Sequence, residues 1–176
     1  LAIQSESYNV DIHSLVIDND FVYIGGYRIF AENATVWKLY KSNLSVVTFS
    51  AAYGGFMGGA LSIAVDNGFL YVGGRGNDTV WKLYKDNLSL VTYSIEYGNV
   101  NSVEIDNDFL YIGGSDYSTN QAVWKLYKSN LSVVTSSVNY EGDINSGGIH
   151  SIVADNYFVY VGGEGNRTVW KLYKDN

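Results

Sequence analysis

Short apolar runs separated by polar turns recur along the whole chain. In residues 88–130, the runs "LSLVTYS" and "NSVEI" lead through the turn "DND" to "FLYIGG", and "AVWKLYK" closes the unit. Runs of this length, rich in Val, Ile, Tyr and Trp and bounded by turn residues, are typical of β-strands. No segment keeps a helical period, so the pattern predicts an all-β fold.

The run ending in "WKLYK" occurs four times, with its tryptophans at Trp37, Trp81, Trp124 and Trp170. Cutting after each Lys-Ser-Asn or Lys-Asp-Asn gives units 1–43, 44–87, 88–130 and 131–176, which we interpret as repeats of a single domain spanning 1–176. Four strands in a repeat of roughly 40–45 residues are typical of a β-propeller blade. The sequence therefore predicts a β-propeller of four four-stranded antiparallel blades. A β-solenoid is the structural alternative, although its coils are usually shorter.

The order of strands in the repeat sets its phase. From the inner to the outer strand, we assign "SIAV" as a, "FLYVGG" as b, "TVWKLYK" as c and "LSVVTFS" as d. The sequence starts on a d-like run, "LAIQSES", and its last unit stops after strand c. We expect this N-terminal strand to complete the last blade, either of its own chain, closing a ring, or of a neighbouring chain, giving a head-to-tail filament. Residue 1 is Leu and not Met. The sequence is therefore either a processed mature protein or a segment of a longer repeat array, and both alternatives stay open.

The b strand ends in an aromatic residue, Val or Ile, and Gly-Gly in every unit: Tyr23–Gly26, Tyr71–Gly74, Tyr111–Gly114 and Tyr160–Gly163. With "FLYVGGRGNDTVWKLYKDNLSLVTYS", the sequence resembles the propeller repeats named for a Tyr-Val-Thr-Asn motif, which occur in surface-layer and other exported proteins of archaea and bacteria. Gly-Gly replaces Thr-Asn here, and that family's Pro-Gly turn is missing. The resemblance implies an extracellular or cell-surface location and a binding or surface-structural role.

Loop length varies on one predicted rim only. The a–b and c–d turns are nearly constant, whereas the d–a and b–c loops differ in every unit, and alternating strand directions place both variable sets on the same rim. Variable loops on a rigid scaffold usually carry function. We predict a face that binds protein or glycan, with drift in loops that contact nothing as the alternative. The predicted binding face carries Arg28, Phe30, Tyr53, Arg75, Tyr97, Tyr117, Tyr140 and Arg167.

The "WKLYK" run invites a functional interpretation because it sets an aromatic ring beside a cation. On a strand, Trp37 and Leu39 point one way and Val36 and Tyr40 the other, so both faces can pack against flanking blades. We interpret the run as scaffold, with the ammonium groups of Lys38 and Lys41 extended to solvent. A cation–π ligand site copied four times is the alternative.

The remaining candidates for chemistry are few. The two histidines, His13 and His150, would be neighbours in a closed ring, but a metal or proton-sensing site there needs further ligands. The "DND" turns are too short to supply the oxygens that calcium requires. No pair of carboxylates stands out for hydrolysis. We therefore expect no cofactor, no metal and no enzymatic activity.

Composition excludes several classes of partner. The net charge is −7, and all eight lysines lie in the "WKLYK" copies, so nucleic acid is not an expected partner. The absence of Cys removes thiolate metal sites and Cys nucleophiles. No apolar run has the length of a membrane span, so membrane insertion is not expected.

Asn-x-Ser/Thr sequons are dense and fall at predicted turns or loops. Such sites are glycan acceptors on exposed loops of exported proteins, although "NLS" is also explained as a repeated turn. The sequence predicts a non-enzymatic extracellular propeller, a surface-structural or adhesive module whose partners are copies of itself, surface proteins or glycans. A ligand-binding propeller is the alternative. The predicted acceptors are Asn33, Asn43, Asn77, Asn87, Asn130 and Asn166.

Overall fold

The computed structural model describes residues 2–8, 10–27, 35–53, 59–75, 79–115, 123–137, 148–163 and 169–175. These segments form four antiparallel sheets, which we call blades 1 to 4. None of them forms a helix with the length and apolar character needed to cross a membrane. Blade 1 holds β1 (Asp11–Ile17), β2 (Phe21–Tyr27), β3 (Val36–Tyr40) and β4 (Val46–Phe49); blade 2 holds β5 (Gly59–Val65), β6 (Phe69–Arg75), β7 (Val80–Tyr84) and β8 (Leu90–Tyr93); blade 3 holds β9 (Asn99–Ile105), β10 (Phe109–Ser115), β11 (Val123–Tyr127) and β12 (Val133–Ser136); blade 4 holds β13 (Ile149–Ala154), β14 (Phe158–Gly163) and β15 (Val169–Tyr173).

Strand order confirms the prediction of an all-β fold built from blades. Blades 1 to 3 each pair four strands in chain order, and blade 4 pairs three, in the order β13-β14-β15. The second, third and fourth repeats thus each supply the outer strand of one blade and the three inner strands of the next.

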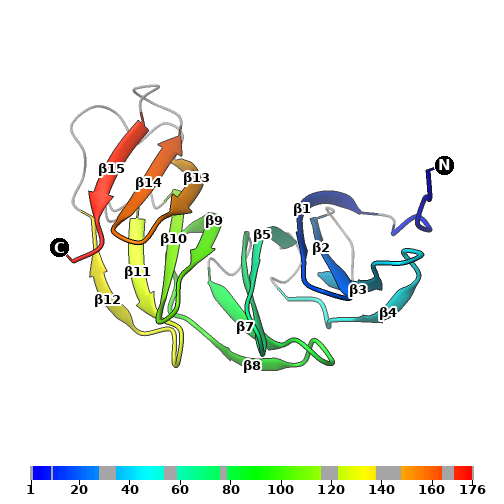
Figure 1. Cartoon of the computed structure of the whole chain (residues 1–176). Helices are drawn as coiled ribbons and strands as arrows, with labels where there is room; N and C mark the ends of the chain where they lie inside the picture. Colours follow the sequence, from blue (N-terminus) through cyan, green and yellow to red (C-terminus); the bar gives the residue numbers. More distant parts are fainter. Residues whose placement is uncertain are drawn as a thin grey trace.

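The blades stand along an open arc, with blade 1 and blade 4 at its two ends (Figure 1). The inner strands β1, β5, β9 and β13 contact one another in succession. Residues 2–8 form no strand and lie at the blade 1 end of the arc. The prediction of a ring closed by the chain's own N-terminal strand is therefore wrong. The three joints between successive blades do not bend the arc enough to bring its ends together.

The hydrophobic core lies between blades more than within them. One cluster joins Tyr23 and Val36 of blade 1 to Ile63 and Leu88 of blade 2, and its counterparts join blades 2 and 3 and blades 3 and 4. Burial of apolar surface contributes about 25 cal/mol per Å², so the clusters stabilise the contact between successive blades. The prediction that both faces of strand c pack against flanking blades is confirmed for blades 2 and 3.

The Gly-Gly pair at the end of strand b permits this close approach. A Cβ on Gly73 would lie 2.5 Å from Val100 and 2.6 Å from Val103, both on the inner strand of the next blade. Gly25 meets Ala60 and Ile63 in the same way. A side chain at these positions would push adjacent blades apart.

The two constant turns use different backbone devices. Asp18 Oδ1 accepts hydrogen bonds from the backbone N–H groups of Asp20 and Phe21, as expected of an Asp-led turn. In the c–d turn, the left-handed residue is a leucine and not Asn or Asp. Its φ is 58° at Leu44, 59° at Leu88 and 60° at Leu131, and its N–H bonds the carbonyl four residues before it. Leu88 and Leu131 are buried against the preceding blade, which explains an apolar residue in this conformation.

Candidate functional site

The first lysine of each "WKLYK" run spans a joint between blades. Lys38 Nζ donates to the carbonyl oxygens of Lys85 (3.1 Å) and Asp86 (3.3 Å) in the next blade, and it lies 4.0 Å from the centroid of the Phe21 ring. Its side chain is buried, so the prediction of a solvent-extended Lys38 is wrong, because carbonyl groups and a ring take the place of water. Lys82 and Lys125 repeat the contact with blades 3 and 4. The cation–π pair is thus an internal contact at these joints.

The second lysine of the run makes an ion pair in the opposite direction. Lys128 Nζ lies 2.9 Å from Asp66 Oδ2, across the joint between blades 3 and 2. Burial raises the pKa of Asp66, but hydrogen bonds from Lys128 and from the N–H groups of Gly68 and Phe69 outweigh it and leave that pKa below its ordinary value. The same pair joins Lys85 to Asp18 at 3.2 Å and Lys174 to Asp106 at 2.7 Å.

A serine hydroxyl on each inner strand completes the repeated joint. Ser14 Oγ accepts a hydrogen bond of 3.0 Å from the backbone N–H of Ile63. Ser62 does the same for Val103, and Ser102 for Ile152. Every joint inside the chain therefore combines one lysine on carbonyls, one Lys–Asp pair and one serine on an inner-strand N–H. We call this combination the joint contact set.

The tyrosines that follow strand d pack against the next blade. Tyr53 stacks on Trp81 at 6.0 Å between ring centroids, and Tyr97 lies 5.3 Å from Trp124. Tyr53 is half-buried, and Tyr97 is 3% exposed. The placement of Tyr97 on the predicted binding face is therefore wrong, because its ring is buried over a tryptophan of the blade that follows.

Little of the predicted binding face falls on described residues. Arg75 ends β6 and is exposed, as predicted. Arg28, Phe30, Tyr117, Tyr140 and Arg167 lie outside the described residues, so the predicted binding face stays a prediction there.

Three of the predicted glycan acceptors lie in c–d turns. The side chains of Asn43, Asn87 and Asn130 are exposed, and each Oδ1 accepts hydrogen bonds from the N–H and hydroxyl of the serine two residues later. The turn accounts for the repeated "NLS" by itself, and occupancy by glycan stays a prediction. Asn33, Asn77 and Asn166 lie outside the described residues.

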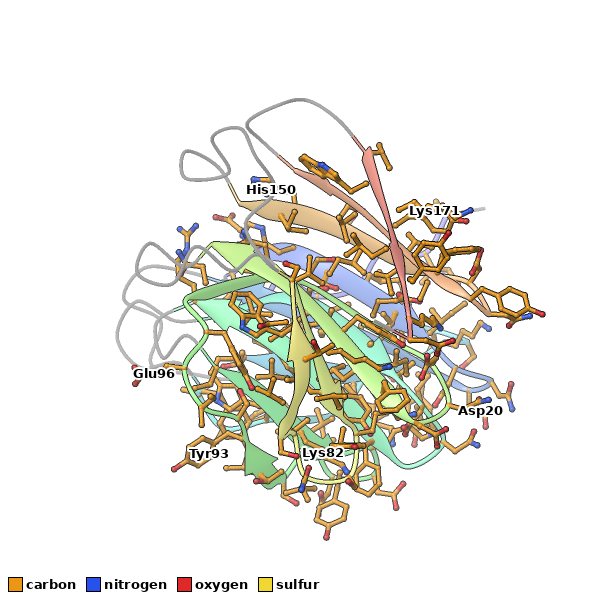
Figure 2. All side chains as sticks on the ribbon, turned by 90° about the vertical axis from the view of Figure 1, so that its left-hand side faces the viewer. Asp20, Lys82, Tyr93, Glu96, His150 and Lys171 are labelled. Carbon is orange, nitrogen blue, oxygen red and sulfur yellow. The ribbon has the colours of Figure 1, made fainter. Side chains whose placement is uncertain are left out.

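The two histidines do not form a site within one chain. His13 lies on β1 and His150 on β13, at opposite ends of the arc. In the described part of the chain, no three His, Asp or Glu side chains are placed to hold a metal ion. Figure 2 shows His150 towards the rim where Glu96 lies, with Asp20 at the opposite rim.

The two end blades expose positions that are buried at every inner joint. Val169 of blade 4 is 76% exposed, whereas its equivalents Val36 and Val80 are fully buried. On blade 1, Ile12 and Leu15 are 51% and 60% exposed. Figure 2 looks onto the blade 4 end and shows Lys171 on β15. We call the outward side of blade 4 (Ser151, Asp155, Gly162, Val169 and Lys171) the C-terminal end face, and that of blade 1 (Ile12, Leu15 and Lys41) the N-terminal end face.

A cavity of about 220 Å³ lies between β12 and β15. Its lining includes Tyr111 and Val123. At the two inner joints, the equivalent tyrosine and valine belong to the clusters that Leu88 and Leu131 fill. The cavity therefore marks the region where blade 4 lacks the turn leucine and the outer strand of the other blades.

Neither a family model nor a curated protein sequence matches the chain. Solved structures do match. The crystal structure of the computationally designed Ika4 protein has a TM-score of 0.75 at 10% identity and covers 97% of this chain and 96% of that one. The fold is a β-propeller. The designed Ika8 protein matches with a TM-score of 0.73 at 9% identity, over 97% of this chain and 48% of its own. BamB from Moraxella catarrhalis matches with a TM-score of 0.65 at 12% identity, over 90% of this chain and 45% of its own. This propeller chain thus spans nearly all of one match and about half the length of the other two.

Proposed function

We propose that this propeller is a non-enzymatic, extracellular module that acts in surface structure or adhesion and assembles head to tail through its end faces. The carrying observation is the exposure of Val169, Ile12 and Leu15 at positions that the inner joints bury. Exposed apolar groups ringed by polar ones are typical of protein interfaces. Copies of the same chain are the partners that fit, because the two end faces are opposite sides of one repeated joint.

A structural role also agrees with how the repeat uses its reactive groups. The lysines, aspartates and serines that recur in every unit make the joint contact set, so the most repeated chemistry of the sequence serves packing. The extracellular location rests on the resemblance to exported propeller repeats and on the sequons. Nucleic acid and membrane insertion have no part in this proposal.

The proposal is tested by measuring mass in solution. Sedimentation velocity and light scattering from low to high micromolar concentration should give a mass above the 19.5 kDa of one chain. A mass of 19.5 kDa throughout would contradict self-assembly. Intact mass of material from the native source, with its distribution between cells and medium, tests glycosylation and location separately.

A further inference from the structure

We propose that two copies of this chain close into a ring of eight blades, in which each joint between copies repeats the joint contact set. Residues 2–7 of each copy then form the outer strand of blade 4 of the other. This inference rests on the proposed function, since it specifies how the end faces meet.

The polar groups for such a joint are in place at both ends. Lys171 occupies the position of Lys38, Lys82 and Lys125, and it is exposed with its ammonium 3.6 Å from the Phe158 ring centroid. By the inner register it donates to the backbone carbonyl of Lys41 in the second copy. Three polar contacts are therefore expected at each joint between copies: Lys171 with the Lys41 carbonyl, Asp155 with the Lys41 ammonium, and Ser151 Oγ with the Leu15 N–H.

The apolar groups are equally complementary. The first Gly of the pair is covered by the next inner strand at each inner joint, where a Cβ would lie 2.7 Å from Ala60 at Gly25 and 2.5 Å from Ile149 at Gly113. At Gly162, nothing lies within 4 Å of that Cβ position. The residues that the register brings there are Ile12 and Leu15 of the second copy, both exposed in one chain. The uncovered surface at Gly162 of the C-terminal end face thus meets the exposed side chains of Ile12 and Leu15 on the N-terminal end face of the other copy.

The N-terminal segment already has the local conformation of an outer strand's end. Ser50 Oγ donates to the Ala51 carbonyl (2.8 Å) and accepts from the Val36 N–H (3.0 Å). Ser5 Oγ donates to the Glu6 carbonyl at 3.0 Å in the same way. Ser5 aligns with Ser50, and Val169 aligns with Val36. In the ring, Ser5 Oγ would therefore accept a hydrogen bond from the Val169 N–H of the second copy.

The tyrosine three residues after each of these serines sets the course of the segment. Tyr8 lies 5.5 Å from Trp37, as Tyr53 does from Trp81 at 6.0 Å. Tyr53 follows the outer strand of blade 1 and packs on blade 2. By the same relationship, the segment before Tyr8 extends away from blade 1 in the direction that the outer strand of a preceding blade would take. Figure 1 shows residues 2–7 at that end of the arc. The outer edge of β15, beside the 220 Å³ cavity, is where that strand adds.

Curvature favours two copies over a longer assembly. The four-blade arc overlays 48% of the Ika8 chain with a TM-score of 0.73 and 45% of the BamB chain with 0.65. It is therefore shaped like about half of a longer propeller, and a second copy supplies the other half. A two-fold ring leaves no open sheet edge, whereas a filament keeps one at each end.

The test uses the full chain and two matched pairs of variants. Wild type should give a single species of twice 19.5 kDa whose mass stops rising with concentration. Gly162→Ala should weaken association by at least about tenfold, because the new Cβ displaces Ile12 and Leu15 of the other copy. Gly68→Ala is the control, since a Cβ there also meets nothing within 4 Å in one chain, and it should leave association unchanged.

The second pair tests the donated strand. Ile3 aligns with Thr48, which pairs with Lys38 in blade 1. Ile3→Pro should weaken association by at least about tenfold, because proline removes an N–H and resists strand pairing. Ile3→Thr should not. Residues 2–8 form no strand in one chain, so circular dichroism at high dilution should show both variants folded.

Each other outcome decides against the inference in a different way. Mass that keeps rising with concentration indicates an open filament and overturns the ring while the proposed function stands. A dimer insensitive to Gly162→Ala and Ile3→Pro uses another surface, which overturns the ring and assembly through the end faces while self-association itself stands. A persistent monomer overturns both, and indicates that something other than a second copy covers the end faces, such as further repeats in a longer chain.

Discussion

Lys128 and Asp66 meet across the joint between blades 3 and 2, with Nζ 2.9 Å from Oδ2, and the carboxylate oxygen also accepts the hydroxyl of Tyr71 at 3.1 Å. The pair ties the c–d turn of one blade to the a–b turn of the blade before it. Both side chains are partly shielded, at 14% and 22% exposure. Removing one partner of a shielded pair leaves the other charge uncompensated, so the loss costs more than at an exposed surface pair.

Asp66→Asn should therefore lower the free energy of unfolding by about 1–2 kcal/mol. The amide keeps an oxygen for the turn but loses the charge that faces Lys128. Urea denaturation at neutral pH measures the change. Asp20→Asn is the control in the equivalent turn of blade 1, where the side chain is exposed, and it should shift stability by less than about 0.5 kcal/mol. Equal effects of the two variants would show that the ion pair contributes no more than an exposed surface carboxylate.

Stability should fall in acid through the three joint aspartates. Hydrogen bonds and ion pairs outweigh burial at Asp18, Asp66 and Asp106 and hold each pKa below its ordinary value of 3.8. A carboxyl with a lowered pKa in the folded chain binds fewer protons when folded than when unfolded, so its contribution is complete above pH 3.8 and is lost as pH falls through the lowered pKa. Urea midpoints should be flat from neutral pH to about pH 5 and drop below pH 4. Asp66→Asn should reduce the drop, and a drop of unchanged size would contradict the assignment.

Adding a single methyl group at a joint should be costly. Gly73→Ala places Cβ 2.5 Å from a methyl of Val100, so blades 2 and 3 must separate slightly. We expect a loss of about 1–3 kcal/mol, since overpacking outweighs the entropy that alanine saves in the unfolded chain. Thermal and urea unfolding both report it. Gly68→Ala, where the new atom has open space, should be neutral or slightly stabilising. A Gly73→Ala chain as stable as that control would contradict the explanation that Gly-Gly is needed for the close approach of adjacent blades.

The hydroxyl of Tyr97 should be dispensable. It is buried without a hydrogen-bond partner among the described residues, and burial raises the pKa of Tyr97 to about 12. Tyr97→Phe should leave stability unchanged or raise it by up to about 1 kcal/mol, because an unsatisfied buried group is removed. Tyr97→Ala should cost about 3–5 kcal/mol through loss of the ring on Trp124. Tyr53→Phe is the comparison, since the Tyr53 hydroxyl donates to the Leu88 carbonyl at 3.4 Å, and it should be slightly destabilising.

Strand positions were predictable because each depends on a local pattern. The run "FLYVGG" and the Asp-led turn before it read the same in every unit, and β6 and its turn have the predicted form. The rim assignment also held for the constant turns, since Lys41 N–H of the c–d turn bonds the Asp20 carbonyl of the a–b turn. Local spacing carries this information, so internal comparison of the four units recovers it.

Features that depend on the neighbouring blade could not be predicted in this way. Lys38 is buried because its acceptors are carbonyls 47 and 48 residues later in the chain, and Tyr97 because its partner is Trp124. The left-handed Leu88 contradicts local turn preference and is explained by burial against blade 1. Ring closure depends on the summed bend of three joints, a quantity that no single repeat encodes.

The serine contacts Ser14–Ile63, Ser62–Val103 and Ser102–Ile152 make the joints inside the chain interchangeable. If the same contacts form between copies, the two kinds of joint differ only in effective concentration, which the connecting peptide sets inside a chain and the solution sets between chains. A tandem fusion of two copies would then turn a bimolecular equilibrium into an intramolecular one without a new contact. For such a repeat, subunit number and chain length are exchangeable ways of building one particle.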